Sequence, residues 1–86
     1  MEMETETVII TFQHIGRNIS EDLEVPLDIA TSDLVSALNV AYELGIDTSN
    51  IKNCYLKAEK PIVFLKGGRT LREMGIRNGS RIIYAG

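Results

Sequence analysis

One stretch of the chain has the apolar spacing of an amphipathic helix, and this stretch constrains the fold more than any other feature. From residue 32 to residue 44, apolar side chains recur at intervals that place them on a single helical face. They are Leu34, Val35, Leu38, Ala41 and Tyr42. Thr31 or Ser32 is suited to cap the start of this helix, and Gly45 is suited to the left-handed position at its end. A single helix of this kind has to bury its apolar face against another layer.

Two segments with the alternation of β-strands precede this helix. The first has Val8, Ile10 and Phe12 on one face and Ile9, Thr11 and Gln13 on the other. The second alternates Leu23 and Val25 with Asp22 and Glu24, and it ends at Pro26. Gly16-Arg17-Asn18 between them is typical of a turn. The two segments therefore predict a β-hairpin at the start of the domain.

Two further strands are predicted directly after the helix. Residues 51–58 and residues 62–65 are apolar runs, and Glu59-Lys60-Pro61 between them is a turn signal. Gly67-Gly68 ends the second run. These two runs supply the second part of a sheet on which the helix can pack.

The remainder of the sequence predicts a short helical turn and a last strand. Thr70 and Glu73 have the spacing of a capping box, which favours one helical turn before Gly75. Asn78-Gly79 then predicts a bend into a strand that runs from residue 81 to residue 84 or 85. The full order predicts an α+β domain in which a mixed sheet packs on one main helix, with a short helical turn before the last strand.

Length and composition limit the chain to one domain. Its 86 residues, 44% of them hydrophobic, have material for a single core, which we assign to residues 7–86. Residues 1–6 have no apolar face, so we expect a flexible acidic N-terminus. No apolar run approaches the roughly 20 residues that span a bilayer, and the start of the chain is acidic, unlike a secretory signal. We therefore expect a cytoplasmic protein without direct membrane insertion.

Charge is distributed unevenly along the chain. Through Asn50 there are ten acidic residues and one basic residue, whereas from Ile51 onward there are two acidic residues and eight basic ones. Such polarity favours a charged partner or contact between two copies of the chain, although exposed charges are often only a solvated surface. Nucleic acid is not expected as a partner, because the chain is acidic and its basic residues have no aromatic stacking platform.

The sequence contains no recognisable catalytic constellation. Cys54 is the only cysteine, which excludes an intrachain disulfide and a multi-thiolate metal site. His14 is the only histidine, and no nucleophile or carboxylate has a spacing that pairs with it. We expect His14 to close the first strand at the hairpin turn. The chain is therefore expected to be no enzyme, with no catalytic, cofactor-binding or metal-binding residue.

Two short segments carry a resemblance to ubiquitin. Gly68-Arg69-Thr70-Leu71 resembles the Gly-Arg-Thr-Leu segment that ubiquitin has between its fourth and last strands, and Leu23-Glu24-Val25 matches ubiquitin's second strand. The resemblance covers nearly the whole chain from Thr7 onward. It implies the β-grasp fold.

Within that superfamily the chain is similar to the YukD/EsaB proteins, the small ubiquitin-like accessory components of bacterial type VII (WXG100/ESX-like) secretion systems. The likeness lies in residues 22–26 before a helix, in Ile62-Val63-Phe64, and in residues 74–80 before the last strand. It implies an accessory or regulatory role without enzymatic activity. The implied partners are cytoplasmic parts of a membrane secretion ATPase complex, which would hold the protein at the inner face of the cell membrane. A homodimer stays open.

The resemblance also implies a protein-binding patch on the solvent face of the sheet. Matched strand for strand, Ile9 and Ile83 are expected to face outward from the first and last strands, with Ala85 beside Ile83 and Tyr55 joining from the third strand. Because a β-grasp sheet pairs its first and last strands, we expect the two isoleucines to be neighbours in one apolar patch.

Two other functions remain as alternatives. The chain could be a ubiquitin-like modifier or sulfur carrier that acts through Gly86, but Ala85 stands where such proteins have the first of two glycines, and the last strand leaves almost no tail. It could also be a ubiquitin-like recognition domain cut from a larger protein.

Overall fold

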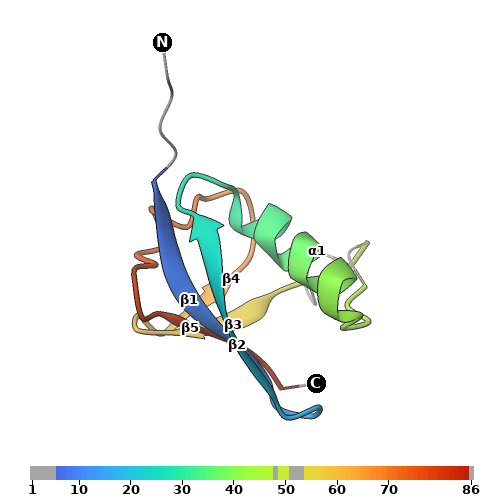
Figure 1. Cartoon of the computed structure of the whole chain (residues 1–86). Helices are drawn as coiled ribbons and strands as arrows, with labels where there is room; N and C mark the ends of the chain where they lie inside the picture. Colours follow the sequence, from blue (N-terminus) through green and yellow to red (C-terminus); the bar gives the residue numbers. More distant parts are fainter. Residues whose placement is uncertain (1–5, 48, 51–53, 86) are drawn as a thin grey trace.

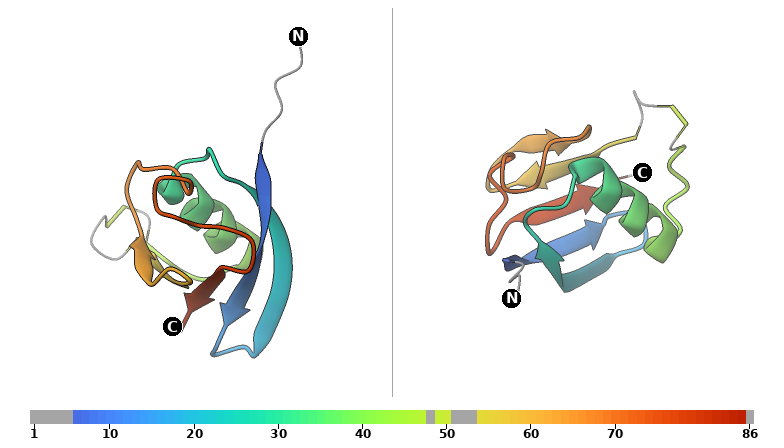
Figure 2. Two further views of the ribbon diagram at one scale, coloured as in Figure 1. Left: turned by 90° about the vertical axis from the view of Figure 1, so that its left-hand side faces the viewer. Right: turned by 90° about the horizontal axis from the view of Figure 1, so that it is seen from above.

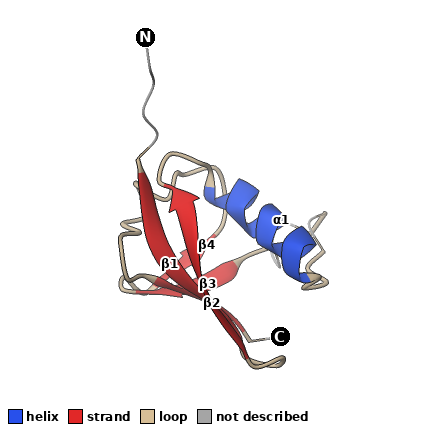
Figure 3. Ribbon diagram, in the orientation of Figure 1, coloured by secondary structure: helices blue, strands red, loops and turns tan. Residues whose placement is uncertain are grey.

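A computed structural model describes residues 6–47, 49–50 and 54–85. In this part of the chain one helix lies across one face of a sheet (Figure 1 and Figure 3). The elements are β1 (Thr7–His14), β2 (Ile19–Pro26), α1 (Thr31–Tyr42), β3 (Leu56–Glu59), β4 (Val63–Leu65) and β5 (Arg81–Tyr84). The predicted α+β arrangement of two layers is confirmed. α1 lacks the length and the apolar character that a helix needs to cross a membrane.

The strands form one mixed sheet in the order β2-β1-β5-β3-β4. The central strands β1 and β5 are parallel, and the other neighbouring pairs are antiparallel. The predicted hairpin is confirmed, with Thr7 opposite Pro26 at its open end and His14 opposite Ile19 beside the turn. Seen along the sheet, α1 covers one side and leaves the other bare (Figure 2).

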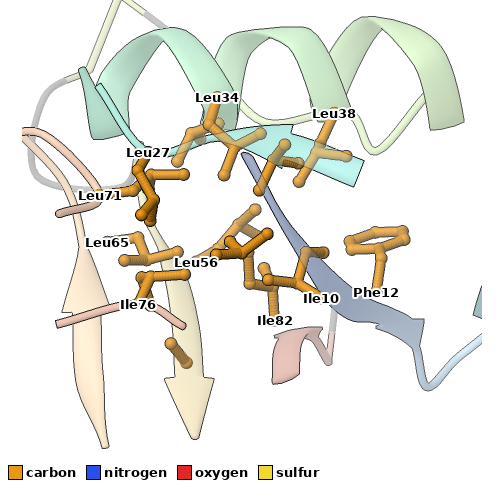
Figure 4. Close-up of a cluster of buried hydrophobic side chains, with 14 of the residues drawn as sticks. Ile10, Phe12, Leu27, Leu34, Leu38, Leu56, Leu65, Leu71, Ile76 and Ile82 are labelled. Carbon is orange, nitrogen blue, oxygen red and sulfur yellow. The ribbon is translucent and has the colours of Figure 1, made fainter. Parts of the chain in front are cut away.

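The core fills the space between α1 and the sheet (Figure 4). The predicted alternation of β1 is confirmed, because Val8, Ile10 and Phe12 are all buried. Of the apolar helix face, Leu34, Val35 and Leu38 are buried and Tyr42 is partly buried. Ala41 is exposed, so its predicted place in the core was wrong. The larger Tyr42 ring packs on Phe12, with ring centroids 4.5 Å apart, and fills the space under the last turn.

The start of α1 differs from the prediction. Ala30 occupies the cap position, and no side chain caps the helix there. The hydroxyl of Thr31 instead donates to the carbonyls of Lys66 and Gly67, at 3.1 and 2.8 Å. The prediction of Thr31 or Ser32 as the cap was therefore wrong, because the loop after β4 provides a nearer acceptor for the Thr31 hydroxyl.

The end of α1 also differs. Glu43, with φ of 52°, takes the left-handed conformation that ends the helix, while Gly45 is left-handed two residues later, with φ of 76°. The guanidinium of Arg17 donates to the carbonyls of Tyr42 and Glu43, at 2.7 and 3.1 Å. A cation at a helix C-terminus satisfies the last carbonyls and the helix dipole. The hairpin turn thus fixes where α1 stops.

The second part of the sheet is shorter than predicted. The strand expected over 51–58 is β3, which begins at Leu56, and residues 51–53 of the prediction lie outside the described residues. β3 pairs with β5 from Lys57 to Glu59 and with β4 from Leu56 to Ala58. β4 confirms most of the run predicted over 62–65.

The capping box and the bend before β5 are confirmed. The backbone N–H of Glu73 donates to the Thr70 hydroxyl, and the Thr70 N–H donates to the Glu73 carboxylate, both at 3.1 Å. The single turn that they close ends at Gly75, whose φ of 83° is left-handed. Gly79, with φ of 88°, then makes the bend into β5. These turns carry the chain back to the centre of the sheet.

Candidate functional site

The face of the sheet that α1 leaves uncovered is the candidate site. Because side chains alternate along a strand, the residues between the buried ones point to this outer face. On β1 and β5 these are Ile9, Thr11, Gln13, Arg81 and Ile83, and on β3 and β4 they are Lys57, Glu59 and Phe64. β2 adds Asp22 and Glu24, which pair with Thr11 and Ile9 on the same face.

Four apolar residues gather at one end of the outer face, where β5, β3 and β4 adjoin. We call them the aromatic patch: Tyr55, Phe64, Ile83 and Ala85. They line a hollow of about 380 Å³. The rings of Tyr55 and Phe64 meet edge to face, with centroids 5.4 Å apart and an angle of 87° between their planes. Although Tyr55 is 41% exposed and Phe64 57% exposed, this contact holds both rings at the rim of the hollow.

The structure brings three of the four predicted patch residues together and separates the fourth. Tyr55, Ile83 and Ala85 line one hollow, whereas Ile9 does not border it. Ile83 pairs with Gln13 on β1, four residues beyond Ile9, which is about 13 Å along the strand at about 3.3 Å per residue. The expectation that Ile9 and Ile83 are neighbours was wrong, although both lie on the outer face.

The bend before β5 is the physical reason for this separation. The backbone N–H of Ile9 donates to the Asn78 side chain at 2.8 Å, and the Gly79 N–H donates to the Ile9 carbonyl at 3.0 Å. The bend therefore occupies the place beside Ile9 that a longer β5 would have filled. Pairing of β5 with β1 starts only at Thr11, opposite Arg81.

Sequence reasoning missed Phe64, whose ring is more exposed than that of Tyr55 in the aromatic patch. A signal for it was present, because Leu65 belongs to the core and its neighbour on a strand has to face the other way. Phe64 also pairs with Lys57 of β3, which places it two strands from Ile83 on the same face.

Basic side chains border the aromatic patch. Lys57 stands between Ile83 and Phe64, and Lys66 borders a second hollow of about 250 Å³ beside the two rings. Both are exposed, and neither has an ion-pair partner in the described part of the chain. Glu59, the acid of β3, is already paired with Arg81 at 3.1 Å. The patch is therefore apolar with a positive margin.

A perturbed carboxyl group lies away from the aromatic patch, in the loop after β2. The Arg72 guanidinium donates to Asp28 at 2.9 Å and to Glu6 at 3.2 Å. The hydrogen bond from Arg72 holds the pKa of Asp28 below its ordinary value of 3.8. This cluster ties the start of β1 to the turn that contains Arg72.

Metal ligands do not cluster among the described residues. No group of three or more His, Cys, Asp or Glu side chains in this part of the chain is placed to hold a metal ion. His14 is the last residue of β1, as predicted. It is buried there, its Nδ1 accepts the Arg17 N–H at 3.3 Å, and its ring meets Tyr84 edge to face. Cys54 is a half-buried free thiol. Gly86 lies outside the described residues.

No protein-family model matches the chain, and no curated protein matches it. Solved structures do match. A ubiquitin-like domain of an Arabidopsis thaliana protein superposes with a TM-score of 0.69 at 17% identity, covering 95% of this chain and 79% of that one. The C-terminal ubiquitin-like domain of mouse tubulin-specific chaperone e gives 0.71 at 10% identity, covering 99% and 93%.

A third similar structure is the ubiquitin-like domain of the Mycobacterium tuberculosis type VII secretion system protein EccD1. It superposes with a TM-score of 0.57 at 22% identity, and the match covers 94% of this chain and 99% of that one. At these identities the likeness shows the fold, which is the ubiquitin-like β-grasp. Ubiquitin-like domains are generally non-catalytic and commonly mediate protein interactions.

Proposed function

We propose that the chain is a non-enzymatic protein-interaction module that serves as a cytoplasmic accessory or regulatory component of a bacterial type VII secretion system. The observation that carries the interaction role is the aromatic patch on the uncovered face of the sheet. The likeness to the ubiquitin-like domain of EccD1 supports the secretion role, because it spans nearly the whole of both chains.

The composition of the aromatic patch is that of a binding centre. Aromatic side chains are enriched in the buried centres of protein interfaces, where a few of them supply most of the binding energy. Tyr55 and Phe64 expose rings that already restrict each other, so little side-chain entropy is lost when a partner covers them. The hollow between these rings and Ile83 has room for an apolar side chain of the partner.

The proposed partner is a cytoplasmic part of the membrane secretion ATPase complex. This contact would bring the protein to the inner face of the cell membrane without any insertion of its own. The positive margin formed by Lys57 and Lys66 would favour a partner segment that carries carboxylates next to its apolar anchor.

The test replaces the chromosomal copy in a bacterium with an active type VII system. Ile83→Lys places an ammonium group in the hollow, and Phe64→Ala removes one ring from its rim. Val40→Lys is the matched control, because Val40 is 78% exposed on α1, on the other side of the domain. Two quantities are measured: secretion of the small helical substrates, and co-purification of the tagged protein with the membrane complex.

We expect both patch variants to reduce co-purification more than tenfold and to lower secretion, while Val40→Lys behaves as the wild type. Circular dichroism of the purified variants checks that each one is folded. Patch variants that are folded, co-purify normally and secrete normally would show that the aromatic patch is not the binding surface. If deletion of the whole chain leaves secretion unchanged, the secretion role is wrong.

A further inference from the structure

The outer face carries a second surface that complements the aromatic patch. At the opposite corner, Ile9 is 47% exposed and pairs with Glu24 on β2, and Asp22 follows on the same face. We call Ile9, Asp22 and Glu24 the acidic corner. Glu24 accepts a hydrogen bond from the Thr7 hydroxyl at 2.6 Å and Asp22 accepts one from Thr11 at 2.9 Å, so both carboxylates are held above the face.

The two surfaces match in chemistry. The acidic corner offers one apolar side chain beside two carboxylates, and the aromatic patch offers one hollow beside the ammonium groups of Lys57 and Lys66. The two surfaces cannot meet within one molecule, because they lie on the same face at opposite ends of the sheet. They can meet only between two copies.

We propose that the chain forms a closed two-fold dimer through its outer sheet faces. In this dimer Ile9 of each copy enters the hollow of the other, and Asp22 and Glu24 lie against Lys57 and Lys66. A two-fold axis between the faces produces this contact twice, as an isologous interface requires. The dimer goes beyond the proposed function and does not depend on it.

Size limits the strength of this dimer. Five strands about 4.8 Å apart and about 20 Å long give a face of roughly 480 Å², so two faces bury on the order of 1,000 Å², which is at the low end for specific interfaces. A weak dimer stabilised by exposed charges is sensitive to salt, because ions screen such charges beyond about 10 Å at 0.1 M. Since the dimer covers the aromatic patch, it also competes with any other partner of that patch.

Charge reversal provides the decisive experiment. One variant carries Asp22→Lys and Glu24→Lys, which makes the acidic corner basic. The other carries Lys57→Glu and Lys66→Glu, which makes the margin of the aromatic patch acidic. Each variant alone has like charges at both contacts. A mixture of the two has opposite charges at both contacts, because the altered corner of one meets the altered margin of the other.

Sedimentation velocity from about 10 µM to about 1 mM, in 20 mM and 500 mM salt, measures association of the purified full chain. We expect the wild type to dimerise with a dissociation constant that rises with salt, each variant to dimerise at least about tenfold more weakly, and the equimolar mixture to regain the wild-type affinity. Ile9→Ala is expected to weaken the dimer without changing its salt dependence.

Two results would overturn the dimer. One is a wild type that stays monomeric at 1 mM in low salt, and the other is association that neither charge-reversed variant weakens. Neither result bears on the proposed function, since Asp22→Lys/Glu24→Lys leaves the aromatic patch intact and its co-purification with the secretion complex can be measured separately. Self-association and binding to the secretion complex can therefore be tested separately.

Discussion

Ser80 provides the sharpest test of how the turns around the sheet are held in place. Its side chain is fully buried just before β5. The hydroxyl donates to the Lys60 carbonyl at 2.6 Å and accepts the Arg77 N–H at 3.0 Å. One side chain thus joins the bend that leads into β5 to the turn between β3 and β4. The sequence spacing between them is twenty residues.

Ser80→Ala removes only the hydroxyl oxygen, so the lost free energy can be worked from these two contacts. Each hydrogen bond contributes about 1 kcal/mol net, and a buried partner left unpaired costs about 1–3 kcal/mol. Two partners lose their bond at a part-buried site. We expect the free energy of unfolding to fall by about 2–3 kcal/mol, which lowers the melting temperature of a domain of this size by about 10–20 °C.

The assay is equilibrium unfolding in urea, followed by circular dichroism. The midpoint should fall while the slope with urea concentration stays unchanged, because the variant exposes the same surface on unfolding. Ser36→Ala is the matched control: Ser36 lies within α1, where alanine has the higher helix propensity, so this variant should be neutral or slightly stabilised. A loss below about 0.5 kcal/mol for Ser80→Ala would refute the reasoning, since it would mean that water replaces both bonds.

Three further predictions concern other parts of the chain. Thr31→Val keeps the shape of the side chain but removes the hydroxyl that donates to Gly67. Unfolding in urea should therefore show a free energy of unfolding that is lower by about 1 kcal/mol. Thr31→Ser should keep the hydrogen bond and lose only the packing of a methyl group. Because Arg72 lowers the pKa of Asp28, the charged pair contributes stability above pH 3.8, and this stability is lost as the pH falls through the lowered pKa of the folded state. Asp28→Asn should therefore flatten the profile of stability against pH on the acid side. An unchanged profile would contradict the pairing. Incubation with an activating enzyme and ATP should leave the intact mass unchanged, because Ala85 replaces the first glycine that modifiers need, and an adenylate or thiocarboxylate at Gly86 would establish the modifier function instead.

The layers of the fold could be predicted because burial alone determines them. Val8, Ile10 and Phe12 had to share a face by the period of a strand, and Leu34 and Leu38 had to share one by the period of a helix. Burying these two apolar faces against each other gives the two-layer arrangement of a helix on one face of a sheet. The capping box of the short turn was predictable for a similar reason, since its hydrogen bonds are local in sequence.

The ends of α1 could not be predicted, because partners distant in sequence determine them. Thr31 has the side chain of a capping residue, but in the fold its hydroxyl reaches Gly67, thirty-six residues away. Arg17 binds the last carbonyls of the helix from the hairpin turn, so the chain leaves the helix at Glu43 before the glycine that local rules favour. Local propensity gives way when a tertiary hydrogen bond competes for the same group.

The candidate site shows the same limit, and here the error is informative. The alternation of side chains along a strand determines which residues point away from the core, so Ile9 and Ile83 could be assigned to the outer face from the sequence. Register between parallel strands depends on the connection before the second strand. Here the Ile9 N–H donates to Asn78 and the Ile9 carbonyl accepts from Gly79, so the pairing of β1 with β5 starts at Thr11. The bend separates the two isoleucines, and each then lies beside charges of a different sign: Ile9 pairs with Glu24 on β2, and Ile83 pairs with Lys57 on β3. A single central apolar patch would accept a partner in several orientations. Two separated ends of different chemistry instead select one orientation, in which the partner, or a second copy, places a basic surface at the acidic end and an acidic surface at the basic end.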